Sequence, residues 1–62
     1  MGDQNHRIKK ARLSRGWTKT DLAKQAKVST RTIDRAENGD KITDATRHKI
    51  ANALNMQVED LF

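Results

Sequence analysis

The sequence contains no cysteine and no proline, and it has a single tryptophan and a single phenylalanine. Without cysteine the chain can form neither a disulfide nor a thiolate metal site, which is compatible with a reducing cytoplasm. No apolar run approaches the roughly 18 residues of a membrane span, and the N-terminus has no hydrophobic signal region. We therefore expect a cytoplasmic domain with no contact to a membrane.

The chain has 62 residues, enough for one domain. A domain of this size buries only about 60% of the surface of its unfolded chain, so its stability is marginal. The absence of proline, the scarcity of β-branched runs and the lack of alternating apolar and polar residues predict an all-α fold.

The formal net charge of +5 is unevenly distributed along the chain. Residues 1–31 hold nine basic and two acidic side chains, a net charge of +7. Residues 32–62 hold four basic and six acidic side chains, a net charge of −2. Such polarity indicates a basic side that attracts a polyanion, although a merely solvated surface explains the charge alone equally well.

Five helices are predicted, with residues 1–5 as a flexible tail and residues 6–62 as the folded domain. Their expected ranges are about 5–15, 19–27, 30–38, 44–54 and 58–62. Thr18 with Asp21, Ser29 and Thr43 are typical N-terminal caps. Gly16 and Asn55 suit the left-handed conformation that ends a helix. Apolar residues at helical spacing form the expected core: Ile8, Ala11, Leu22, Ala23, Ala26, Val28, Ile33, Ala36, Ile50, Ala51 and Leu54.

The segment KTDLAKQAKVSTRTIDRAEN, residues 19–38, reads as two short helices joined by a three-residue turn. The chain also contains four shorter motifs, two of which overlap this segment: RLSRG, TKTDLA, KVSTRTIDRAENG and the closing IANALNMQVEDLF. In this order and at these spacings the chain resembles the Cro/repressor-type, or XRE, helix-turn-helix family over nearly its whole length. The resemblance implies a compact five-helix, repressor-like domain whose second and third helices form the helix-turn-helix.

The resemblance also implies a structural ion pair between an arginine of the first helix and a glutamate at the end of the third, here Arg12 and Glu37. The chain departs from the family pattern at several positions. Lys27 replaces the usual glycine of the turn, where φ is positive. Arg47 and His48 replace two leucines, which should thin the core around the fourth helix, and Trp17 replaces another leucine.

A recognition helix enters the major groove with its N-terminal half. On that face the sequence offers four candidates for contact with base edges: Thr30, Arg31, Thr32 and Arg35. Arginine suits guanine O6 and N7, and threonine can hydrogen-bond or contact the thymine methyl. Asp34 could accept from cytosine N4, but we expect it to pair with Arg31, three residues earlier.

Phosphate contacts are expected at helix ends, where backbone N–H groups point outward. The candidates are Thr18, Lys19, Ser29, Asn38, Lys41, Arg7 and Lys10. The C-terminal end has an unusually high density of apolar side chains, and we expect these to form a homodimer contact: Met56, Val58, Leu61 and Phe62. A two-fold dimer would place two recognition helices one helical turn apart on a palindromic operator.

The predicted function is therefore sequence-specific binding to double-stranded DNA by a transcriptional regulator. A phage- or mobile-element-type repressor fits, as does the DNA-binding domain of a longer repressor. An antitoxin or protein-interaction module on the same fold is the main alternative, and RNA binding is less favoured because the A-form major groove excludes a helix. No cofactor, metal, small-molecule ligand or enzymatic activity is expected, since neither His6 nor His48 has catalytic companions in the sequence.

Overall fold

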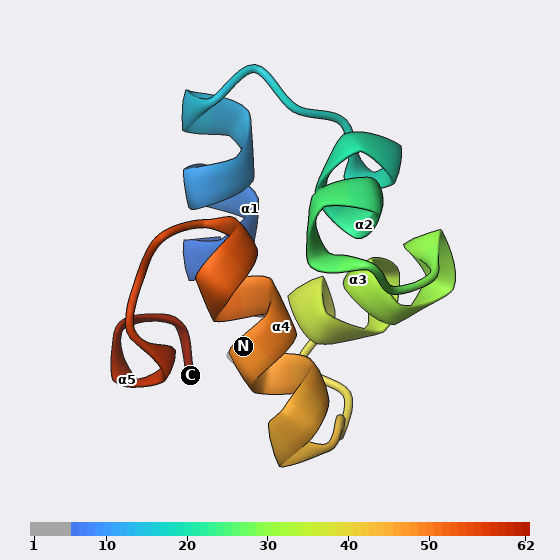
Figure 1. Cartoon of the computed structure of the whole chain (residues 1–62), viewed down its shortest axis with the longest axis vertical. Coiled ribbons are helices and arrows are strands. Elements are labelled where there is room, and N and C mark those ends of the chain that lie inside the picture. The colour runs from blue at the N-terminus through green and yellow to red at the C-terminus, as the bar shows by residue number, and fades with distance from the viewer. Residues whose placement is uncertain (1–5) are drawn as a thin grey trace.

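The computed structural model describes residues 6–62, which form five α-helices and no strand (Figure 1). The all-α prediction is confirmed within that range. The helices are α1 (His6–Ser14), α2 (Lys19–Ala26), α3 (Thr30–Glu37), α4 (Asp44–Ala53) and α5 (Val58–Leu61). The predicted tail, residues 1–5, and the expected start of the first helix at Asn5 lie outside the described residues.

Side-chain caps begin three of the helices where the sequence predicts them. The Thr18 hydroxyl accepts from Asp21 N at 3.1 Å, and Thr18 N donates to the Asp21 carboxylate at 2.9 Å, so α2 opens with a complete capping box. The Ser29 hydroxyl accepts from Thr32 N at 3.1 Å at the start of α3. Thr43 caps α4 through Thr46 N at 3.2 Å. Each cap satisfies a backbone donor that the first turn of a helix leaves free.

A residue in the left-handed conformation follows four of the helices, and after α3 it is Gly39, with a φ of 83°. Gly16 after α1 has a φ of 71°, Lys27 after α2 has a φ of 61°, and Asn55 after α4 has a φ of 56°. Glycine adopts this conformation freely and asparagine tolerates it, whereas lysine has a Cβ that crowds the backbone. The turn between α2 and α3 is therefore strained at Lys27.

The core lies where α2 meets α3 and α4, and where α1 meets α3 and α5 (Figure 1). Its fully buried large side chains are Ile8, Leu22, Ile33, Ile50, Leu54 and Leu61. Leu61 was predicted for a dimer contact, but it is only 1% exposed. It occupies the core because α5 folds back against α1 and α4 and turns this side chain inward.

Arg47 and His48 do not prevent α4 from forming. His48 is exposed. The Arg47 guanidinium lies 5.4 Å from the centre of the ring of Phe62, the residue that follows α5, so its charge lies over the aromatic face. Ile50 and Leu54 supply the large buried side chains of this region.

A buried ion pair ties α1 to α3. Arg12 Nε donates to Glu37 Oε2 at 2.7 Å, Arg12 Nη2 donates to Oε1 at 3.3 Å, and both side chains are more than 90% buried. Arg12 Nη1 also donates to the Trp17 carbonyl at 2.9 Å. The two residues expected to pair therefore do so with bidentate geometry, and the same guanidinium holds the loop before α2.

The strain at Lys27 predicts that Lys27→Gly will stabilise the domain. Relief of the left-handed conformation should raise the free energy of unfolding by about 0.5–1 kcal/mol, even after the entropy that glycine adds to the unfolded chain. Urea denaturation would measure it. Lys24→Gly is the matched control, because it removes the same charge within α2 and should lower stability by about 1 kcal/mol. Equal effects of the two substitutions would contradict this reading of the turn.

Glu37→Leu should lower the free energy of unfolding by about 3–5 kcal/mol, because it leaves the buried Arg12 charge without its partner. The double variant Arg12→Met/Glu37→Leu should recover much of that loss, since no buried charge remains. Urea denaturation of the single and double variants would check this. A single variant as stable as the double would show that the pair is not effectively buried in solution.

Candidate nucleic-acid interface

The outward face of α3 carries a row of polar side chains. Arg31, Asp34 and Arg35 are spaced by three and four residues and so lie on one side of the helix, opposite the buried Ile33 and Ala36. Arg31 and Arg35 are exposed, and Asp34 is half-buried. The core contacts of α3 leave Arg31 and Arg35 on the outer, solvent-exposed side of the helix.

The other two predicted base contacts lie at the edges of this face. Thr30, the first residue of α3, is exposed. Thr32 is half-buried, and its hydroxyl lies 2.8 Å from the Ser29 hydroxyl within the N-terminal cap. The hydroxyl of Thr32 is therefore engaged in holding the start of α3, which makes it less available to a base than the arginines.

The expected pair between Asp34 and Arg31 does not form, and Asp34 has other partners. Its Oδ1 accepts from Lys19 Nζ at 2.6 Å, and its Oδ2 accepts from Asn38 Nδ2 at 3.4 Å. The hydrogen bond and the charge of Lys19 hold the pKa of Asp34 below its ordinary value. The partner is Lys19 because the packing of α2 against α3 brings the start of α2 beside the middle of α3.

The predicted phosphate contacts of the helix-turn-helix lie at or just beyond the ends of α2 and α3. Thr18 and Ser29 are exposed caps at the N-termini of α2 and α3, so their hydroxyls stand beside outward-pointing backbone N–H groups. Asn38 and Lys41 are exposed just beyond the C-terminus of α3. Lys19 has one of its three donors on Asp34, which leaves the others for an anion. This arrangement has the donors and positive charge that a phosphate backbone requires.

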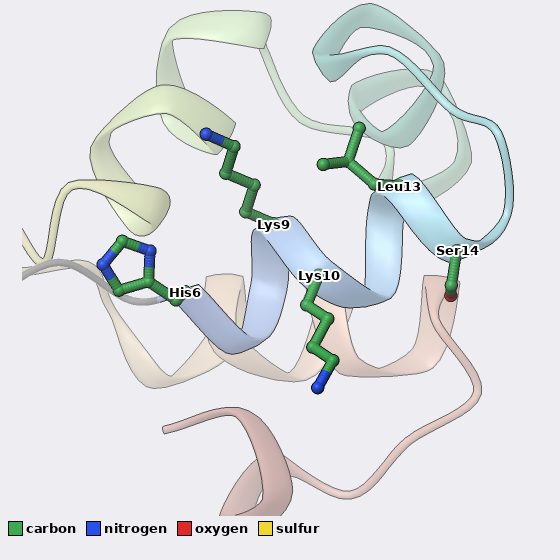
Figure 2. Close-up of a pocket in the computed structure, with 5 residues that line it drawn as sticks. All are labelled: His6, Lys9, Lys10, Leu13 and Ser14. Atoms are coloured by element: carbon green, nitrogen blue, oxygen red, sulfur yellow. The ribbon is translucent and has the colours of Figure 1, made fainter.

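Arg7 and Lys10 lie elsewhere. Together with Asp60 and Met56 they line a groove between α1 and the α5 segment. Figure 2 shows Lys10 extending from α1 toward that side, while Lys9 extends from the opposite side of the helix. The structure therefore does not bring these two predicted phosphate contacts together with the helix-turn-helix residues.

Sequence reasoning missed Leu13, which is 54% exposed and is the most exposed large apolar side chain of residues 6–62. It lines a shallow surface of α1 with His6, Lys9, Lys10 and Ser14 (Figure 2). The signal was present in the sequence, because the helical period that turns Ile8 and Arg12 inward turns residue 13 outward.

A family described as helix-turn-helix matches residues 8–61, nearly the whole of the described chain. The chain belongs to the XRE-type helix-turn-helix family. Neither a curated protein nor a solved structure matches it. The family consists of DNA-binding regulatory domains rather than enzymes, so this member is a DNA-binding transcription regulator. None of the helices within residues 6–62 is long and apolar enough to cross a bilayer.

The lowered pKa of Asp34 gives the Lys19 contact a defined pH dependence. A carboxyl group whose pKa is lower in the folded than in the unfolded state stabilises the fold above its unfolded pKa, and this contribution is lost as pH falls through the folded pKa. We expect wild type to be more stable than Asp34→Asn at about pH 6, and this difference to shrink as the pH falls below the ordinary carboxyl pKa of about 4 and the carboxylate becomes protonated. Urea denaturation at about pH 6 and at about pH 3 would test it. A difference that persists undiminished in acid would contradict an ionic origin.

Proposed function

We propose that this regulator binds a specific double-stranded DNA sequence through α3 in the major groove and acts as a repressor. The observation that carries the proposal is the outward row on α3, with Arg31 and Arg35 exposed on a helix that the Arg12–Glu37 pair holds in place. A rigidly held recognition helix with arginines one turn apart can present guanidinium donors to guanine O6 and N7. Membership of a DNA-binding family supports the same conclusion.

In this proposal Arg31, Arg35 and Thr30 contact base edges, and Thr32 contributes through its methyl group. Thr18, Lys19, Ser29, Asn38 and Lys41 contact phosphates and set the register of α3 on the duplex. Arg7 and Lys10 line a groove with Asp60 on the α5 side of the domain, so in this proposal they contact only the flanking part of the DNA backbone. A palindromic operator, a cytoplasmic location and a phage- or mobile-element-type role complete the proposal.

We further propose that the protein binds its operator as a homodimer. Phe62 is 38% exposed, and Met56 and Val58 are half-buried in the same C-terminal segment. Phe62 is therefore the main residue of the proposed dimer contact, together with Met56 and Val58. Leu61 is buried and supports this surface from within the core. Two-fold pairing of this end would leave both α3 faces exposed for half-sites about 10 base pairs apart.

Selection from a randomised duplex pool, followed by affinity measurements at two salt concentrations, tests the proposed function. An enriched palindrome and a steep fall of affinity with salt are expected, since several phosphates would release their counterions on binding. Weak, sequence-blind binding would contradict it. That outcome would favour the alternative of a protein-interaction module, for which Leu13 and Phe62 supply exposed apolar side chains.

Arg31→Ala should weaken binding to the selected site by about 1–3 kcal/mol and relax preference at one base position. Lys41→Ala is the matched control: it also removes one exposed cation, but it should weaken all duplexes alike and make the salt dependence less steep. Titration of both variants against selected and random duplexes would separate the two roles. Equal losses on both duplexes for Arg31→Ala would remove this residue from the base contacts.

A further inference from the structure

Asp34 is an acidic side chain in the middle of a DNA-facing helix surface. It lies three residues after Arg31 and four residues after Thr30, and it precedes Arg35 directly. An isolated carboxylate at this position would be repelled by the phosphates on both sides of a groove. Its presence among the proposed base contacts therefore calls for a physical reason.

The structure shows how the charge of Asp34 is compensated. Lys19 Nζ lies 2.6 Å from Oδ1, so the pair is electrically neutral as a unit, and Asn38 Nδ2 approaches Oδ2 at 3.4 Å. These contacts come from two sides, one from the start of α2 and one from the end of α3. They restrict the rotation of the carboxylate and fix the direction of its oxygens.

The compensated carboxylate keeps its capacity to accept hydrogen bonds. The Asp34 side chain is still 48% exposed, and two oxygens that receive one donor each retain lone pairs. An ionised carboxylate can only accept. In the major groove guanine presents two acceptors and thymine presents an acceptor and a methyl group, whereas cytosine presents the N4 amino donor. Adenine has a donor too, but its neighbouring N7 acceptor faces a carboxylate unfavourably.

We propose that Asp34 is a specificity-determining residue that accepts a hydrogen bond from cytosine N4, and that Lys19 is the residue that positions it. The inference rests on the proposed function, because it requires α3 to lie in the major groove. Lys19 then has a second role besides phosphate contact, because its positive charge offsets the repulsion between the Asp34 carboxylate and the DNA phosphates. The base pair next to those read by Arg31 and Arg35 would then be selected as C·G.

The test compares the sites that wild type, Asp34→Asn and Glu59→Gln select from the same randomised duplex pool. Each variant loses one negative charge, but Glu59 is an exposed residue of α5, which lies on the opposite side of the domain from α3 in Figure 1. In the sites selected by Asp34→Asn, the preference for cytosine at one position should fall by about fivefold to tenfold. Adenine should be favoured there instead, since an amide pairs with adenine N6 and N7. Glu59→Gln should select the wild-type site. Thermal unfolding would verify that both variants fold.

A double-mutant cycle tests the role of Lys19. Lys19→Met should weaken binding to the cytosine site much more when Asp34 is present than in the Asp34→Asn background, because only the carboxylate needs a neutralising partner. Lys19→Arg should restore most of the cytosine preference. An equal loss in both backgrounds would show that Lys19 contacts phosphate only and would overturn its positioning role.

The outcomes distinguish this inference from the function on which it rests. A wild-type pool with no enriched sequence would overturn the proposed function, and the inference with it. An enriched site that Asp34→Asn selects unchanged would leave the proposed function standing and overturn the assignment of Asp34. A change confined to one base position, absent in Glu59→Gln, supports the assignment.

Discussion

The orientation of α3 depends on the buried ion pair between Arg12 and Glu37. The guanidinium contacts both oxygens of the carboxylate and also the Trp17 carbonyl, so one side chain joins α1, the loop before α2 and the end of α3. A domain of this size has few large apolar side chains to define the angle between its helices. A bidentate pair has strict geometry, and it fixes the angle between α1 and α3 more tightly than apolar packing alone would.

The relation between α2 and α3 is set by local chemistry at the turn and by one contact across it. Lys27 takes the left-handed conformation, Val28 packs against the core, and the Ser29 hydroxyl caps α3. The contact between Lys19 and Asp34 joins the outer sides of the same two helices. Two kinds of contact therefore hold α2 and α3 together: apolar packing on their inner sides and an ion pair on their outer sides. A recognition surface benefits from such rigidity because its side chains are oriented before DNA arrives.

Several of the basic side chains are engaged in contacts within the domain. Arg12 is neutralised in the core by Glu37, and Lys19 is compensated by Asp34. Arg15 donates to the Leu54 carbonyl and lies 5.8 Å from the Trp17 ring centre, and Arg47 covers Phe62. Four of the basic side chains thus have structural tasks. The exposed Arg31, Arg35 and Lys41 are more informative about binding than the net charge of +5.

The sequence by itself determined the helices, their caps and their left-handed ends, because a cap such as Thr18 with Asp21 acts between residues three apart and needs no distant partner. Family resemblance extended this to the pairing of Arg12 with Glu37. Only the tertiary structure decided that Asp34 meets Lys19 rather than Arg31, that Leu61 enters the core, and that Lys10 extends toward α5. Each of these depends on how helices distant in the sequence pack together, and an exposed lysine or a terminal leucine carries no local signal of its partner.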